Sequence, residues 1–264
     1  MSQTELSVNQ IRENASANAF RRRLGQLAPL VGCWTSLANH LTTEILGYAG
    51  FDWLLIDGEH APNDLSTFIT QLMALKDSSS AAVVRPQSSE PVIIKRLLDI
   101  GFRNFLMPFV DSAEQAANLV AATRYPPQGV RGIGAAHRAN RYGHEGRYFA
   151  EANDNISVLA QIESVAGLQN VDAIAAVDGI DALFVGPADL SAALGCSGPE
   201  APAVQRAIVR VIECGRIHGK ATGIFAPVES DARRYLNMGM TVVAVGGDVA
   251  LLRNASVALC RRFQ

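Results

Sequence analysis

The chain has 264 residues, of which 48% are hydrophobic, and it carries a formal net charge of −2 with a pI near 6.2. This size and apolar content suit a single α/β barrel, while the small net charge disfavours nucleic acid or an anionic membrane as a partner. No run of eighteen apolar residues and no secretory signal occur, so we expect a cytoplasmic protein that acts on a small molecule.

The four cysteines are far apart in the sequence, and no two have the C-x-x-C spacing of common zinc sites. They are Cys33, Cys196, Cys214 and Cys260. This spacing argues against a zinc site or a disulfide framework, and we expect reduced cysteines that mainly fill space in the core.

Residues 1–20 are polar and are expected to form an N-terminal extension, with one barrel domain over residues 21–264. After a short basic helix at 20–27, apolar runs alternate with helical segments eight times. The expected strands cover residues 30–34, 51–56, 81–85, 104–108, 157–163, 182–186, 221–225 and 241–246. The expected helices that follow them cover residues 42–49, 64–75, 91–100, 112–123, 165–176, 203–218, 229–238 and 248–263. Eight such alternations predict a parallel, right-handed (β/α)8 TIM barrel of the α/β class.

One long segment without an apolar period, residues 124–155, contains YPPQGVRGIGAAHRANRYG. Loops of this length inside a compact domain are often lids or binding loops. Its glycines at 129, 132 and 134 do not follow a strand and open a helix, so they are no dinucleotide-binding fingerprint.

Ionisable and polar side chains follow the predicted strands at one end of the barrel. They are Asp57, Glu59 and His60 after the second strand, Arg85 at the third, Gln161 and Glu163 at the fifth, and Asp189 after the sixth. Active sites of such barrels lie at the carboxyl ends of the strands, and carboxylates without cysteine suit Mg²⁺ or Mn²⁺. Structural roles stay open: Asp57, Glu163 or Asp189 could cap helices, His60 could be a loop histidine, and Arg85 could pair with either Glu163 or Asp189.

The three lysines, Lys76, Lys95 and Lys220, fall on helices or before the seventh strand. A Schiff-base lysine must lie in the active site, so imine chemistry is disfavoured. If the barrel activates a carbonyl compound, we expect a metal ion to do it.

Several segments in this order resemble the HpcH/HpaI aldolase family of metal-dependent (class II) pyruvate aldolases. They are GFDWLLIDGEHAPND, VVRP, IIKRLLDIG, TRYPPQGVRG, QIES, LFVGPADLSAALG and FAPVESDARRYL. The resemblance runs from about residue 30 to the end of the chain. It implies a (β/α)8 barrel that exchanges its last helix between protomers and forms a homo-oligomer, a hexamer built as a trimer of dimers.

The resemblance also implies roles for individual residues. Glu163 and Asp189 match the ligands of Mg²⁺, for which Mn²⁺ or Co²⁺ could substitute, and His60 matches the base. Arg85 matches the arginine that stabilises developing charge, and Asp99 the acid that raises the basicity of the histidine. Gln161, Ala188 and Asp189 match the contacts to the keto-acid substrate, although relatives carry serine at the position of Ala188.

Within the family, segments such as STFITQLMALK and HRAN favour the branch that cleaves 5-keto-4-deoxy-D-glucarate or 2-keto-3-deoxy-D-glucarate to pyruvate and tartronate semialdehyde. Candidates for binding the distal carboxylate of such a substrate are Arg124, Arg131, His137, Arg138 and Arg141 in the long loop. The alternatives are a sibling aldolase acting on 4-hydroxy-2-oxoheptanedioate or a 2-keto-3-deoxy sugar acid, and a carbon-carbon lyase acting on a CoA ester.

Overall fold

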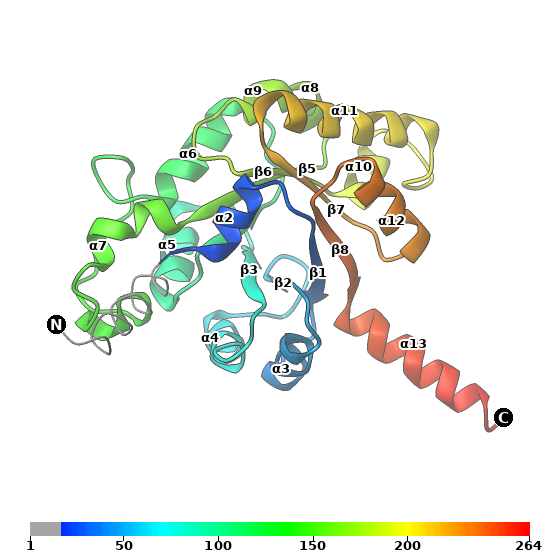
Figure 1. Cartoon of the computed structure of the whole chain (residues 1–264), viewed down its shortest axis with the longest axis horizontal. Coiled ribbons are helices and arrows are strands. Elements are labelled where there is room, and N and C mark those ends of the chain that lie inside the picture. The colour runs from blue at the N-terminus through cyan, green and yellow to red at the C-terminus, as the bar shows by residue number, and fades with distance from the viewer. Residues whose placement is uncertain (1–16) are drawn as a thin grey trace, which may run out of the picture.

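The structure, a computed structural model, describes residues 17–264, and most of the extension expected over residues 1–20 lies outside this range. Eight parallel strands form a closed barrel in the order β1 to β8, with helices outside it (Figure 1). The strands are β1 (Leu30–Thr35), β2 (Trp53–Asp57), β3 (Ala81–Arg85), β4 (Asn104–Met107), β5 (Ser157–Ile162), β6 (Ala182–Val185), β7 (Ala221–Phe225) and β8 (Val242–Gly247). The predicted (β/α)8 fold is therefore confirmed.

The residues along each strand alternate between two apolar cores, because successive side chains of a strand point to opposite faces. On β2, Trp53 and Leu55 point into the barrel, whereas Leu54 and Ile56 pack against the surrounding helices. Gly32 of the neighbouring strand makes room for the indole, since a Cβ atom there would lie 2.1 Å from Trp53. Both faces are thus buried, which is why the strands appear in the sequence as continuous apolar runs.

The helices are α2 (Ala19–Gly25), α3 (His40–Tyr48), α4 (Leu65–Ala74), α5 (Pro91–Ile100), α6 (Ala113–Thr123), α7 (Tyr148–Glu151), α8 (Val165–Gln169), α9 (Val171–Ala175), α10 (Pro187–Ala193), α11 (Pro202–His218), α12 (Glu229–Asn237) and α13 (Asp248–Arg261). Side-chain caps begin several of them. Asp64 forms a capping box with Thr67 at α4, and Ser112 and Ser164 accept hydrogen bonds at α6 and α8. Phe20 and Leu24 of α2 join the inner core at the amino ends of the strands.

The helices differ from the prediction after β5 and after β6. The helix expected over residues 165–176 is divided at Asn170, whose backbone is not helical (φ −95°, ψ 7°) and whose side chain donates a hydrogen bond to the carbonyl of Asp111. The short helix α10 was not expected, and it begins directly after β6 with Pro187 in its first turn. This helix brings Asp189 to the end of the strand.

The long loop lies at the amino ends of the strands, because it connects α6 to β5. It contains two 3₁₀ turns, η1 (Arg138–Gly143) and η2 (Asn153–Asn155), and helix α7. Two of its arginines are tied to the end of α5: Arg131 donates to Asp99 and Arg138 to the carbonyl of Ile100. The loop therefore lies at the opposite end of its own barrel from the predicted site.

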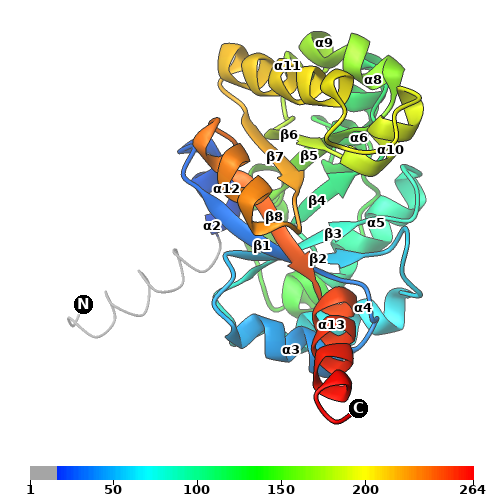
Figure 2. The same cartoon turned by 90° about the vertical axis from the view of Figure 1, so that its right-hand side faces the viewer.

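Helix α13 projects away from the barrel in both views (Figures 1 and 2). Asp248 at its first position is buried, and every side chain from position 251 onward is exposed. Among residues 17–264, no helix combines the length and apolar character needed to cross a membrane.

Candidate active site

A buried ion pair between Asp57 and Arg85 lies at the carboxyl ends of β2 and β3. The two residues are register partners, and Arg85 donates two parallel hydrogen bonds, from Nε to Oδ1 (2.9 Å) and from Nη2 to Oδ2 (2.7 Å). Both residues are nearly inaccessible, with exposures of 1% and 6%. Burial alone would raise the pKa of Asp57, but the hydrogen bonds and charge of Arg85 hold this pKa below its usual value. The pair is thus ionised and fixed in orientation.

Two further groups hold the Arg85 guanidinium. Its Nη1 lies 2.9 Å from Oε2 of Glu59, and its Cζ lies 5.3 Å from the centroid of the Trp34 ring. The Trp34 indole also donates to Oδ2 of Asp57 at 3.3 Å. The guanidinium is therefore held on several sides before any substrate arrives, which is the arrangement expected of a preorganised cationic donor.

His60 follows this pair on an exposed turn. Its side chain is 66% exposed, and Nε2 lies 3.8 Å from Oε2 of Glu59. Asp57 does not cap helix α4, whose N-cap is Asp64. Oδ1 of Asp57 instead accepts the backbone N–H groups of Glu59 and His60. The same carboxylate thus orients Arg85 and shapes the turn that carries His60.

Glu163 is a buried carboxylate directly after β5. Its Oε1 accepts the backbone N–H of Phe109 at 2.9 Å, and its Oε2 accepts the Gln161 side-chain amide at 2.6 Å. Burial, with the charges of Glu59 and Asp189 nearby, raises the pKa of Glu163 to about 7. Helix α8 is capped by Ser164, so Glu163 is not needed as a cap. A buried acid among other acids is a group that a bound cation would stabilise.

Asp189 lies in the first turn of α10, at the end of the neighbouring strand β6. It is exposed, as is Ala188, whose N–H belongs to the part of a helix that lacks internal acceptors. Gly186 leaves the space between β6 and Glu163 open, because a Cβ there would lie 2.2 Å from Oε2 of Glu163.

The residues at this end of the barrel fit a hard divalent cation. Three carboxylates, Glu59, Glu163 and Asp189, influence one another electrostatically. The side-chain oxygen of Gln161 is buried and has no hydrogen-bond partner among the described residues. Oxygen donors without any thiolate are the ligand set that suits Mg²⁺ or Mn²⁺.

Asp99 does not lie beside His60 in this chain. It occupies the last turn of α5, at the amino ends of the strands, where its Oδ1 accepts from Nη2 of Arg131 at 2.8 Å. Nε2 of His137 lies 3.8 Å from the same oxygen. The structure thus gathers His60, Arg85, Gln161, Glu163, Ala188 and Asp189 at one end of the barrel and leaves Asp99 at the other.

Two contributors to the site, Trp34 and Phe109, were not among the residues singled out from the sequence. Trp34 lies at the end of β1 and could have been noticed as a polar-tipped aromatic residue at a strand end. Phe109 has a left-handed backbone conformation (φ 49°), and its backbone N–H donates to Oε1 of Glu163. No side-chain pattern in the sequence reveals such a backbone contact.

Residues 30–255 match the family HpcH/HpaI aldolase/citrate lyase, and the chain belongs to this family. The resemblance found in the sequence motifs is thereby confirmed. The match includes every strand of the barrel and all of the strand-end residues described above.

The chain is also similar to individual proteins with a known activity or a solved structure. The chain is 57% identical to a 5-keto-4-deoxy-D-glucarate aldolase of Escherichia coli O6:H1 over 248 residues, which is 94% of this chain and 97% of the relative. A solved HpcH/HpaI aldolase/citrate lyase family protein from Burkholderia cenocepacia J2315 superposes with a TM-score of 0.91 at 40% identity, covering 94% of this chain and all of that one. The citrate synthase SbnG superposes with a TM-score of 0.82 at 27% identity, covering 92% and 97% of the two chains.

Proposed function

We propose that this protein is a class II aldehyde-lyase that cleaves 5-keto-4-deoxy-D-glucarate or 2-keto-3-deoxy-D-glucarate to pyruvate and tartronate semialdehyde. The observation that carries the proposal is that Glu163 and Asp189 lie with the Asp57–Arg85 pair at the same end of the barrel, at the carboxyl ends of β2, β3, β5 and β6. The 57% identity to 5-keto-4-deoxy-D-glucarate aldolases supports the choice of substrate.

Cleavage of the C3–C4 bond in a 4-hydroxy-2-oxo acid removes a proton from the C4 hydroxyl and leaves pyruvate as its enolate. Glu163 and Asp189 would hold a divalent cation, Mg²⁺ in our proposal, which supplies Lewis-acid polarisation of the 2-oxo group when bound. The fixed guanidinium of Arg85 would donate to the 2-oxo oxygen, on which negative charge develops as the enolate forms. In this proposal the buried oxygen of Gln161 and the N–H of Ala188 would orient the keto acid, and the free acceptor of Gln161 among the described residues supports its part.

His60 is the group proposed to accept the proton from the C4 hydroxyl. Its exposed turn gives the ring access to substrate, and such a proton transfer contributes roughly 100-fold to 10,000-fold in rate. Asp99 can support this histidine only if it comes from a second copy of the chain, because it lies at the opposite end of its own barrel. The neighbouring loop, with its candidate ligands for a distal carboxylate, would then reach the site from the same second copy.

A homo-oligomer is therefore part of the proposed function. Helix α13 offers the means of assembly, because it leaves the barrel with apolar side chains exposed. We propose that this helix packs on another copy, in the exchanged arrangement expected from the family, and that the assembly is a hexamer.

The proposal is tested by measuring pyruvate release from 5-keto-4-deoxy-D-glucarate after removal of metal with EDTA and again after addition of Mg²⁺ or Mn²⁺. We expect activity to disappear and to return with metal. Glu163→Gln should remain inactive at ordinary metal concentrations, whereas Glu213→Gln on the exposed face of α11 should behave as the wild type.

Two results would change the proposal. Pyruvate release that persists in EDTA would exclude the role given to Glu163 and Asp189. Release from 4-hydroxy-2-oxoheptanedioate but not from 5-keto-4-deoxy-D-glucarate, under the same metal conditions, would assign the chain to the sibling activity.

A further inference from the structure

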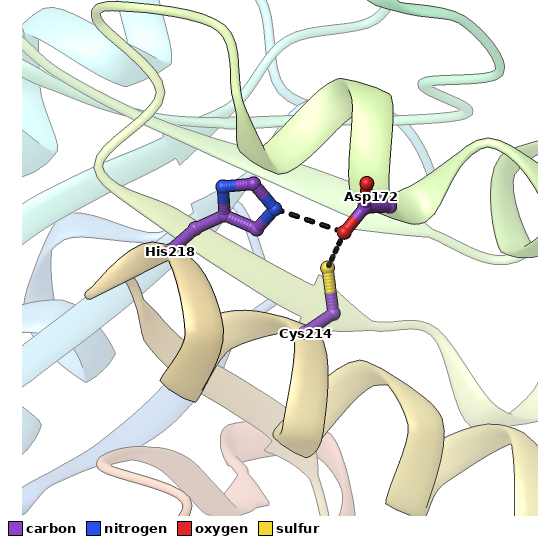
Figure 3. Close-up of side chains that lie close together, drawn as sticks. All are labelled: Asp172, Cys214 and His218. Carbon is purple, nitrogen blue, oxygen red and sulfur yellow. Dashed lines mark hydrogen bonds and ion pairs between the residues drawn. The ribbon is translucent and has the colours of Figure 1, made fainter.

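Helices α9 and α11 bring an acid, a thiol and an imidazole together on the outer layer of the barrel (Figure 3). Asp172 lies in the first turn of α9, and Cys214 and His218 are one turn apart near the end of α11. Residues four apart on a helix share a face, so the thiol and the imidazole point together toward α9. None of the three residues belongs to the strand-end site described above.

The three side chains are already at distances close to those of a metal site. Nε2 of His218 lies 2.9 Å from Oδ1 of Asp172, and Sγ of Cys214 lies 4.0 Å from the same oxygen. All three potential ligand atoms lie within 4.8 Å of one another. A tetrahedral zinc ion, with bonds of about 2.0–2.3 Å, separates its ligand atoms by roughly 3.4–3.6 Å. Small side-chain rotations would bring the three atoms to this spacing.

We propose that Asp172, Cys214 and His218 form a second metal site, which binds Zn²⁺ or a similar transition metal ion with water as its remaining ligand. Thiolate and imidazole ligands favour such metals over Mg²⁺, so this site differs in chemistry from the all-oxygen site at the strand ends. The negative end of the α11 dipole also favours a cation near His218.

One proposed ligand is exposed and another is buried, as a metal site that ions can enter from solvent requires. The Asp172 side chain is 74% exposed and leaves an entry path, while the thiol is buried against the α9 carbonyl of Val171 at 3.5 Å. Burial raises the pKa of the Cys214 thiol, so metal binding must release a proton. A bound ion would link α9 to α11 and thereby stabilise the folded state.

The sequence spacing concealed this cluster. The cysteines have no zinc-type spacing among themselves, and Asp172 lies 42 residues before Cys214. The expectation that the cysteines mainly fill space corresponds to the alternative in which His218 and Asp172 share only their hydrogen bond and the Cys214 thiol binds no metal. The two alternatives differ in whether the thiol becomes a ligand.

Cobalt binding distinguishes a metal site from a simple hydrogen bond. A cysteine thiolate bound to Co²⁺ gives a near-ultraviolet charge-transfer absorption that oxygen ligands do not give. The metal-stripped full-length protein would be titrated with CoCl₂, together with Cys214→Ser, His218→Ala, Glu163→Gln and Cys260→Ser. Cys260→Ser is the matched control, since it removes an exposed cysteine far along the chain from the cluster. Glu163→Gln removes a proposed ligand of the other site.

We expect Co²⁺ to produce the absorption in the wild type and Cys260→Ser. In Glu163→Gln, whose strand-end site has lost a ligand, one equivalent should be enough, and ZnCl₂ should abolish the absorption in all three by displacement. Cys214→Ser should lack the absorption, and His218→Ala should bind at least about tenfold more weakly, since even indirect partners of a metal are worth that much. ZnCl₂ should also raise the melting temperature of Glu163→Gln but not that of the double variant Glu163→Gln/His218→Ala.

No absorption in the wild type, or an absorption that survives in Cys214→Ser, would overturn the proposal. Its loss in Glu163→Gln would overturn the proposal as well, because that variant leaves Asp172, Cys214 and His218 intact. If Cys214→Ser does not fold, His218→Ala decides the question, because His218 is at the partly exposed end of α11 and its loss leaves the core intact.

Discussion

At the scale of single residues, Asp57 supports the proposed chemistry indirectly, because it holds the Arg85 guanidinium in place. We expect Asp57→Asn to lower kcat about 100-fold, because Arg85 loses the negative charge and one of the two oxygens that hold its guanidinium in place. Removing one partner of a buried ion pair typically costs about 3–5 kcal/mol, and Glu59 should keep this loss at the lower end. Steady-state kinetics and urea unfolding measure the two effects.

The matched control breaks an exposed pair of the same kind. Glu229→Gln removes the partner of Arg233, and both side chains are more than two-thirds exposed, so the change in unfolding free energy should stay below about 1 kcal/mol. An Asp57→Asn protein that keeps wild-type kcat would show that Arg85 does not need this anchor.

Residues at strand ends could be predicted well, and residues elsewhere could not. Glu163 and Arg85 directly end buried strands, so the barrel topology alone brings them to one end. Asp99 lies on a helix, and its distance from His60 could not be read from the spacing of the chain. The backbone donor at Phe109 has no sequence signal, since its role comes from a φ of 49°.

At the scale of the elements, the close packing of β5 against β6 depends on Gly186. We expect Gly186→Ala to weaken Mn²⁺ binding about tenfold or more, because the new Cβ would meet the Glu163 carboxylate and the Gln161 amide. The backbone at this position (φ −90°, ψ 90°) accepts alanine, so the fold should be retained. Electron paramagnetic resonance of free Mn²⁺ measures the affinity.

Gly146→Ala is the control, since a Cβ at that loop position meets no atom within 4 Å and should leave Mn²⁺ binding unchanged. Equal affinities in Gly186→Ala and the wild type would mean that the carboxylate of Glu163 can move aside without losing the ion.

The strands were easier to predict from the sequence than the helices. Strands buried on both faces give continuous apolar runs that no loop imitates. Helix α10 is seven residues long and begins at a strand end, so its proline and aspartate looked like loop residues. The division between α8 and α9 follows from the Asn170 contact to Asp111, a contact between segments 59 residues apart.

At the scale of the whole molecule, helix α13 exposes apolar surface that no other segment of residues 17–264 covers. Val249, Leu252, Leu259 and Phe263 recur at intervals of three, four or seven residues and form one stripe, with exposures from 45% to 86%. Such a stripe, on a helix that departs from its barrel, is the surface that another copy would cover in the proposed assembly. The sequence revealed the apolar helix, but its separation from the barrel became visible only in the structure.

We expect the double variant Leu252→Glu/Leu259→Glu to sediment as a smaller species than the wild type, because charges would have to be buried on assembly. Asn254→Glu, on the opposite face of α13, should keep the wild-type assembly. The dissociated variant should still bind Mn²⁺ at the strand ends but lose most of its aldolase activity, since Asp99 could no longer reach His60 from a second copy. An unchanged sedimentation coefficient would exclude α13 as the assembly helix, and full activity in a monomer would show that His60 works without Asp99.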